Sequence, residues 1–262
     1  MTRKNFKCVV AYKGLAYYGW QKQKEFVTVQ GLLEYALNKI FKQEVHTAGA
    51  SRTDAGVHAF GQVFNFRVHT DMEAYELQSF LNSLLPDDIV IKSVEEVPDA
   101  FNSRWNVRRK FYRYAIFTGK TLLPFHSGLC WHLKNRGHLD FEKMKTLLPL
   151  FKGLKNYLSF SKSGSDDKTY FRNLNRVRLT KKGHWVYLDF ESRGFLYQMV
   201  RKLTMVFIYY GLGKITMEDV QKMFEVQDRQ FFSNIAPPDG LYLVKIIYDK
   251  NAQKNEETED DE

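Results

Sequence analysis

One carboxylate stands out among the residues that could do chemistry. Asp54 lies within a stretch from Ala48 to Gly61 that is rich in Gly and Ala and has no apolar period, which is typical of a compact loop. Such a loop lets a substrate approach the backbone closely, and a carboxylate held there is placed to react. The run Thr-Asp-Ala-Gly is equally typical of an Asx turn or a helix N-cap, so spacing alone favours a structural role for Asp54.

The elements around this loop predict an α+β domain. Alternating apolar residues indicate strands, and apolar residues at helical spacing indicate amphipathic helices. The expected elements are a strand over 6–12, a helix after Thr28, a strand with Phe64, Phe66 and Val68 on one face, a helix after Asp71 that stops at Pro86, and a strand over 89–97. Strands and helices in this order suit a sheet with its helices on one face.

The second half of the chain predicts another α+β unit. The elements expected there are a helix capped by Asp140, a polar loop over 161–169, a hairpin around Lys181-Lys182-Gly183, an apolar helix over 195–210 that ends at Gly211, a short helix opened by Thr216, and a strand over 241–248. We therefore expect domains over 1–107 and 108–250, followed by an acidic, disordered tail over 251–262.

The helix expected over 195–210 is apolar nearly all round, which predicts a central, buried position. Arg201 lies within it, and no Asp or Glu occurs from Ser192 to Met217. A buried guanidinium without a partner is costly, so Arg201 should pair with a carboxylate from a distant segment, for which Asp54 is the natural candidate. The alternative is that Arg201 extends its charged head to solvent.

Residues 101–117 combine positive charge with aromatic rings. Arg104, Arg108, Arg109, Lys110 and Arg113 interleave with Trp105, Phe111, Tyr112 and Tyr114. Basic residues hold phosphates while aromatic rings stack on unpaired bases, as single-stranded RNA readers require. A half-buried strand with a solvated basic face explains the same pattern equally well.

Charge and composition favour a polyanionic partner. The net charge is +9, and residues 251–262 sum to −5, so residues 1–250 carry +14. A positive charge of this size favours contact with the phosphates of a polyanion. A basic protein without a polyanionic partner would have the same charge, so charge alone does not distinguish the two. Cys8 fits a buried structural thiol in a reducing compartment, and no signal peptide or membrane-length apolar run is apparent, so we expect a cytoplasmic protein with no membrane contact.

The sequence favours a reaction without a metal or a cofactor. The seven histidines form no HExxH motif and no Cys/His cluster. A Gly-rich dinucleotide motif and a serine nucleophile elbow are also absent from the sequence.

Several separated motifs resemble one family. They are Arg52 to Ala59 (RTDAGVHA) with Gln62-Val63, Gly19 to Gln23 (GWQKQ) with Thr28 to Gln30 (TVQ), Asn82 to Ile89 (NSLLPDDI), Lys110 to Tyr114 (KFYRY), Phe195-Leu196 with Met199 to Arg201 (MVR), and Ala236 to Leu243 (APPDGLYL). In type and order they resemble the tRNA pseudouridine synthase A (TruA) family, from residue 8 to residue 248. Agreement in many blocks is far more specific than one motif.

The resemblance implies a role for each site residue. Asp54 would be the catalytic aspartate, Tyr112 would stack on the target uracil, and Arg201 would pair with Asp54. Arg52 would help to hold the flipped nucleotide, and Leu241 would line the pocket.

The resemblance also implies an architecture and a substrate. It implies a homodimer of chains with two pseudo-repeated α+β halves, ferredoxin- or RRM-like, whose mostly antiparallel sheets are continuous, with the active cleft between the halves. The substrate would be the anticodon stem-loop of tRNA, at positions 38, 39 and/or 40, and no cofactor would be needed.

The chain departs from the family pattern where Ser51 replaces a usual Gly, and also at 155–157, 204–208 and 231–235. None of these positions is Asp54, Tyr112 or Arg201, so activity is expected, while the RNA that is modified stays open. The alternatives are a synthase of this family acting on another RNA, an RNA-binding or RNA-folding protein without turnover, and an Asp-dependent nucleoside N-glycosidase.

Overall fold

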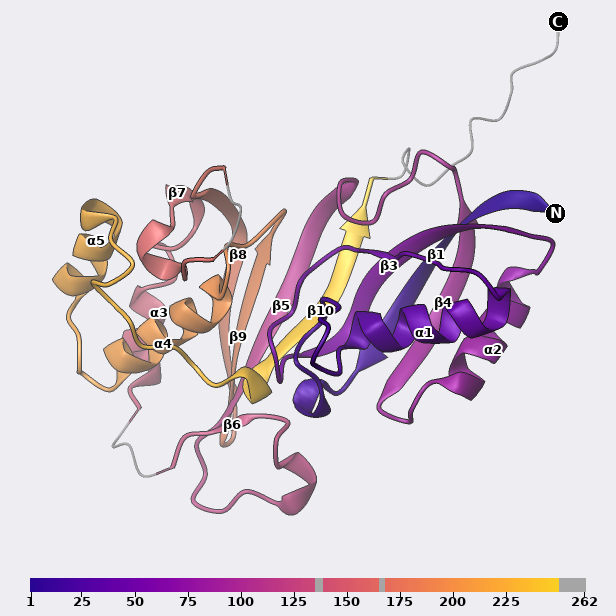
Figure 1. Ribbon diagram of the computed structural model, residues 1–262. Coiled ribbons are helices and arrows are strands. Elements are labelled where there is room, and N and C mark those ends of the chain that lie inside the picture. The colour runs from indigo at the N-terminus through magenta and orange to yellow at the C-terminus, as the bar shows by residue number, and fades with distance from the viewer. Residues whose placement is uncertain (135–138, 165–167, 250–262) are drawn as a thin grey trace, which may run out of the picture. The chain divides into compact units, whose positions relative to one another are not determined.

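The computed structural model describes residues 1–134, 139–164 and 168–249. They form two compact units, one of Met1–Arg108 with the described chain from Leu243 onward, and one of Arg109–Tyr242. Both units combine mostly antiparallel strands with a few helices (Figure 1), so the predicted α+β class is confirmed. The tail predicted over 251–262 and part of the loop predicted over 161–169 lie outside the described residues.

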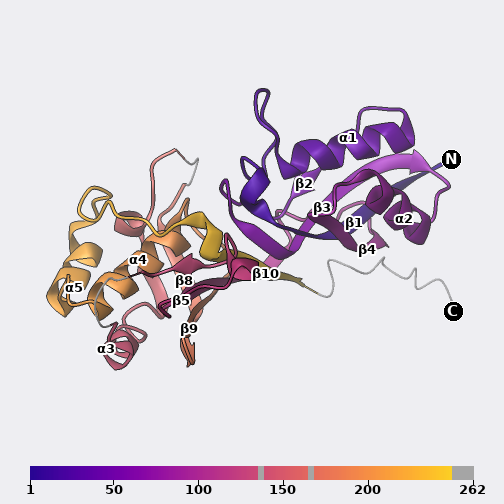
Figure 2. The same ribbon diagram turned by 90° about the horizontal axis from the view of Figure 1, so that it is seen from below.

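The first unit contains three long strands and two helices. Its elements are β1 (Thr2–Tyr12), the 3-10 helix Gly14–Ala16, α1 (Val29–Phe41), β2 (Ala48–Gly49), β3 (His58–Thr70), α2 (Ala74–Leu84) and β4 (Ile89–Val97). Strand β1 pairs antiparallel with both β3 and β4, and β2 pairs with β3. Helices α1 and α2 contact each other and lie against these strands (Figures 1 and 2).

The second unit contains a four-stranded antiparallel sheet and three helices. Its elements are β5 (Val107–Phe117), the 3-10 helix Pro124–His126, β6 (Trp131–His132), α3 (Phe141–Thr146), β7 (Gly153–Asn156), the 3-10 helix Leu158–Phe160, β8 (Phe171–Lys182), β9 (Trp185–Ser192), α4 (Met199–Gly211), α5 (Met217–Val226) and the 3-10 helix Pro238–Gly240. The last strand, β10 (Leu241–Tyr248), begins in this unit and belongs to the first unit from Leu243 onward. The strand order is β5, β9, β8, β7, and β6 joins β5 in parallel. Strands β5 and β10 each have residues in both units.

The helix caps expected from the sequence are present. The Thr28 hydroxyl accepts a hydrogen bond from Gly31 N at 3.3 Å, and the Asp140 carboxylate accepts one from Lys143 N at 2.9 Å. Thr216 and Asp219 form a reciprocal capping box at the start of α5. These bonds satisfy backbone N–H groups that have no partner within the helix, which is why the helices begin there.

Two boundaries differ from the sequence-based expectation. The stretch from Ala48 to Gly61 is not wholly a loop, because Ala48 and Gly49 pair with β3 and β3 itself begins at His58. Helix α4 begins at Met199 and not at 195, because Gln198 has a left-handed φ of 56° that interrupts the helix.

Helix α4 is central in its unit, as its apolar surface predicted. The Phe207 ring lies 5.2 Å from the Phe151 ring and 6.4 Å from the Phe190 ring of β9. Burial of so many apolar side chains is the main favourable term in folding. Among the described residues, every helix is too short or too polar to cross a membrane.

Candidate active site

The loop that carries Asp54 is closed at its base by Gln62. This side chain is fully buried on β3. Its Oε1 accepts hydrogen bonds from Ser51 N and Val63 N, both at 3.2 Å, and its Nε2 donates to Ser51 O at 2.6 Å. Both backbone groups of Ser51 are therefore fixed to the strand that follows the loop.

Thr53, the residue before Asp54, is held by two aromatic residues. Trp20 N donates to Thr53 O at 3.0 Å, and the Tyr12 hydroxyl lies 2.7 Å from Thr53 Oγ1. Gly19 permits this close approach, because it has a φ of +86° and a Cβ there would lie only 2.6 Å from Thr53 O. The loop is thus tied to β1 and to the segment before α1.

The far side of the loop is fixed as well. Val57 N donates to Asp54 O at 3.2 Å, and Gly56 N donates to Tyr17 O at 3.3 Å. His58 Nδ1 accepts from Gly14 N at 3.1 Å, so the neutral ring carries its proton on Nε2. Asp54 itself is half-buried and is followed by a turn and then β3, which excludes the helix N-cap considered from the sequence.

Tyr17, whose carbonyl accepts from Gly56 N, is itself held by a carboxylate. The Tyr17 hydroxyl donates to Asp88 Oδ1, and burial together with this bond raises the pKa of Tyr17. Tyr17 therefore stays neutral at physiological pH and anchors the segment that receives Gly56 N. The loop combines a half-buried carboxylate with a backbone that is held from three sides.

Arg52 is exposed and borders a pocket in the first unit. The pocket has a volume of about 290 Å³. Its lining includes Trp20, Gln21, Gln30, Arg52, Arg104 and Trp105. Asp54 is not among the residues that line it. The pocket therefore lies beside the Asp54 loop without containing its carboxylate.

The other three predicted site residues lie in the second unit, on segments that are bonded to one another. Tyr112 of β5 is 7% exposed, and its ring meets the Phe195 ring edge-on, with 5.2 Å between centroids. Arg201 of α4 is half-buried, and its Nε donates to Ala236 O at 2.8 Å. Leu241 is 6% exposed and begins β10.

Strand β5 is tied to the segment that leads to Leu241. The Tyr114 hydroxyl donates to Pro237 O at 2.6 Å, and burial raises the pKa of Tyr114 well above its ordinary value. A Cβ on Gly240 would lie 2.6 Å from the Tyr114 ring. Tyr112, Arg201 and Leu241 thus belong to one bonded cluster of segments, whereas Arg52 and Asp54 belong to the other unit. The pairing of Arg201 with Asp54 stays a prediction.

The basic and aromatic stretch over 101–117 divides into two parts. On β5, Arg113 makes two bonds to the Asp189 carboxylate, at 2.7 and 3.0 Å, and these raise the pKa of Arg113. Arg109 pairs with Glu191 at 3.0 Å. The half-buried strand therefore explains these two arginines. Arg104 and Trp105 instead lie exposed on the loop before β5, where Trp105 is 64% exposed.

Sequence reasoning missed the residues that hold the loop. The sequence shows Gln62 and His58 only as members of the motifs around Asp54 and assigns neither of them a role. A polar residue at a buried position of an alternating strand is the signal that points to Gln62, because a buried amide needs partners. Within 1–134, 139–164 and 168–249, no group of three or more His, Cys, Asp or Glu side chains could hold a metal ion.

Comparison with known proteins identifies the family. The family model described as tRNA pseudouridine synthase matches residues 8–106 and 148–249. The chain is 40% identical over 245 residues to tRNA pseudouridine synthase A of Thermoanaerobacter sp. (strain X514), covering 94% of this chain and all of the relative.

Two further relatives are also named tRNA pseudouridine synthase A. The enzyme of Acetivibrio thermocellus is 37% identical over 94% of this chain and 100% of its own length. That of Thermodesulfovibrio yellowstonii is 38% identical over 93% of this chain and 99% of its own length. The matched regions include the Asp54 loop and the segments that carry Arg201 and Leu241. We conclude that the chain belongs to the tRNA pseudouridine synthase family of isomerases.

Proposed function

We propose that the chain isomerises uridine to pseudouridine in the anticodon stem-loop of tRNA, at positions 38, 39 and/or 40, with Asp54 as the catalytic carboxylate. One observation carries the proposal. Asp54 lies in a region matched by the family model, in a loop whose backbone is fixed by Gln62 and by Trp20. A reacting group on such a rigid support stays close to its working geometry.

The reaction needs a group that stabilises the charge developing on the ribose, or that bonds to the ribose carbon. The bond from C1′ to N1 of uracil breaks, the base turns, and a bond from C1′ to C5 forms. The hydrogen on C5 leaves as a proton and N1 gains one, so no atoms are gained or lost. An ionised carboxylate stabilises the positive charge that develops at C1′ or adds to that carbon.

The other site residues have supporting roles in this proposal. Arg201 pairs with Asp54, which lowers the pKa of the carboxyl and keeps it ionised at neutral pH. Tyr112 stacks on the target uracil, Leu241 lines the pocket for the base, and Arg52 holds the flipped nucleotide. The edge-on contact between the Tyr112 and Phe195 rings supports this role for Tyr112, because it holds the ring in one orientation.

The partner and the assembly follow from the same reasoning. The charge of +14 over residues 1–250 supports contact with the phosphates of tRNA. The proposed enzyme is a cytoplasmic homodimer that uses no cofactor. Light scattering in solution tests the dimer, which should have twice the mass of one chain, whereas a single-chain mass at all concentrations would contradict it.

A mapping experiment tests the reaction and its position together. Transcribed tRNAs with uridine at only one of positions 38, 39 and 40 are incubated with the protein and treated with a carbodiimide that marks pseudouridine. Reverse transcription should then stop one nucleotide before the modified position, on its 3′ side. The absence of any stop in these tRNAs, with stops in another RNA, would favour the alternative substrate. The absence of stops in every RNA that binds would favour an RNA-binding protein without turnover.

A further inference from the structure

The pocket beside Arg52 has the composition of a nucleotide site. Its volume of about 290 Å³ lies just below the range of roughly 300–1,000 Å³ for drug-sized ligands, so it suits one nucleotide-sized group. Aromatic, amide and guanidinium side chains line it, and no Asp or Glu is among its described lining residues. A cationic pocket of this kind favours a phosphate-bearing ligand.

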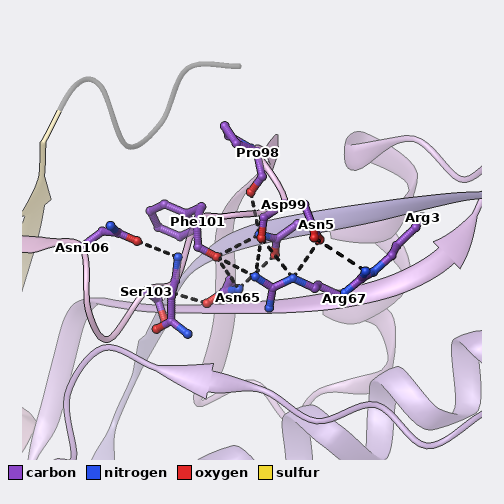
Figure 3. Close-up of polar contacts among 10 residues, drawn as sticks. Arg3, Asn5, Asn65, Arg67, Pro98, Asp99, Phe101, Ser103 and Asn106 are labelled. Atoms are coloured by element: carbon purple, nitrogen blue, oxygen red, sulfur yellow. Dashed lines mark hydrogen bonds and ion pairs between the residues drawn. The ribbon is translucent and has the colours of Figure 1, made fainter. Parts of the chain in front are cut away.

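Buried asparagines hold the segment that precedes Arg104, a residue of the pocket lining. Figure 3 shows the hydrogen bonds of these asparagines. Asn65 is 1% exposed, and its Nδ2 donates to Asn5 Oδ1 at 2.9 Å and to Phe101 O at 3.3 Å. Its Oδ1 accepts from Ser103 N at 2.8 Å. The Tyr248 hydroxyl donates to Ser103 O at 2.8 Å. Ser103 directly precedes Arg104 and Trp105, so this network fixes the base of the wall that presents them.

Gln30 and Thr47, which also line the pocket, are held by a buried carboxylate. Glu34 of α1 is 3% exposed and accepts hydrogen bonds from Thr47 N at 3.0 Å and Gln30 Nε2 at 3.3 Å. Gln30 Nε2 also donates to Thr47 O at 3.0 Å, and Lys22 Nζ lies 3.0 Å from Glu34. The carboxylate charge is thus compensated by Lys22. Hydrogen bonds within the protein thus fix the positions of Gln30 and Thr47 in the pocket lining.

The exposed groups of the pocket match the parts of a nucleotide. The Arg104 guanidinium lies 4.6 Å from the centre of the Trp105 ring, which is 64% exposed. An exposed indole offers a stacking surface for a base, and arginine suits phosphate oxygens. Arg52 lines the pocket and lies two residues from Asp54 in the chain. Arg52 is therefore placed to contact the phosphate that joins a nucleotide in the pocket to a neighbouring nucleotide at Asp54.

We propose that this pocket binds one unpaired nucleotide of the RNA substrate, distinct from the uridine that is isomerised. The base stacks on Trp105, and its phosphate contacts Arg52 and Arg104. The pocket thereby selects RNA with an unstacked nucleotide near the target. This inference rests on the proposed function, because it assumes that RNA reaches the Asp54 loop.

A cycle of protein and RNA changes tests the pocket. The affinity of the full chain is measured for an anticodon-arm RNA and for versions with one abasic nucleotide at each loop position. One abasic position other than the target should weaken wild-type binding about 5- to 150-fold, the range of a lost base stack. Trp105→Ala should weaken binding of the intact RNA by a similar factor, and that abasic position should then cost nothing more.

Matched variants separate this effect from general damage. Tyr75→Ala removes another exposed aromatic ring of the same unit, on α2, and should leave affinity unchanged. Arg104→Gln should make the plot of log affinity against log salt concentration less steep, by the amount expected for the loss of about one phosphate contact. Thermal unfolding checks that each variant is folded, and exposure of Trp105 and Arg104 makes large losses of stability unexpected.

Different outcomes would overturn the pocket proposal and the proposed function. If Trp105→Ala binds like Tyr75→Ala, or if each abasic position costs the same in Trp105→Ala as in wild type, the pocket proposal is overturned. That result leaves the proposed function intact when wild type still forms pseudouridine. If the affinities of wild type and Trp105→Ala change as predicted but wild type forms no pseudouridine, the proposed function is overturned and the pocket proposal stands.

Discussion

Replacing Gln62 by methionine removes three hydrogen bonds at the base of the Asp54 loop while keeping a side chain of similar length. Ser51 N and Ser51 O both lose their bond to Gln62, and Val63 N loses a third. The Asp54 carboxylate is unchanged. The variant therefore tests whether the position of the loop, as distinct from its chemistry, supports activity.

The structure sets the size of the expected effects. Leaving one buried polar group without its partner costs about 1–3 kcal/mol. Three backbone groups are affected, but two of them belong to Ser51, which is only half-buried, so water can reach part of it. We therefore expect the free energy of unfolding to fall by about 2–4 kcal/mol. A displacement of the loop by about 1 Å should lower kcat on the order of 10²-fold.

The assay combines urea unfolding with single-turnover kinetics at a temperature where the variant is folded. Gln78→Met is the matched control, because the Gln78 amide donates to Ile91 O at 3.2 Å and Lys92 O at 3.1 Å, away from the loop. It should lose stability but keep the wild-type rate. A folded Gln62→Met protein with the wild-type rate would refute the argument that Gln62 positions Asp54.

Three further predictions test single residues. Tyr112→Ala should abolish turnover measured on tRNA while Tyr112→Phe retains it, because the ring stacks on the base; full turnover by Tyr112→Ala would remove its assignment. Gly14→Ala places a Cβ against the Val57 carbonyl and should cost about 1–3 kcal/mol by thermal unfolding, whereas Gly194→Ala, with no atom nearer than 4.0 Å, should not. Burial raises the pKa of the Cys8 thiol above its ordinary value of 9.0, so the unfolded chain ionises first and the free energy of unfolding should fall as pH rises above about 9. Cys8→Ala should weaken the dependence of the free energy of unfolding on pH, measured by urea titrations. An unchanged dependence would contradict ionisation of the Cys8 thiol as its cause.

Local patterns predicted much of the fold. The strands Ile89–Val97 and Leu241–Tyr248 match the residues expected from alternation. Thr28 and Asp140 cap helices as their types suggested, because a cap depends on a few neighbouring residues only. Cys8 is buried and unpaired with another cysteine, as its strand position indicated.

Other features depend on contacts that sequence patterns do not show. The apolar pattern runs without a break through Phe195, yet the left-handed backbone of Gln198 delays α4 to Met199. Small residues such as Ala48 and Gly49 give no alternation, so β2 was missed. The pocket unites α1 with a loop some seventy residues later, and only the folded chain brings Gln30 and Trp105 together.

The candidate site was predicted chiefly through resemblance. Spacing alone favoured a structural role for Asp54, and the motifs shared with a family gave Asp54, Tyr112 and Arg201 their roles. The bonds from Gln62, Tyr12 and His58 were not predicted, because each joins positions whose closeness depends on strand pairing.

The most direct test of the account follows the hydrogen on C5 of uridine. An anticodon-arm RNA labelled with tritium at that carbon is incubated with wild type or with Asp54→Asn, since forming the bond to C5 expels the label. We predict release by wild type and none by Asp54→Asn, with both proteins binding the RNA. Equal release by the two proteins would contradict the catalytic role of Asp54, and no release by wild type from any bound tRNA would contradict the proposed reaction on tRNA.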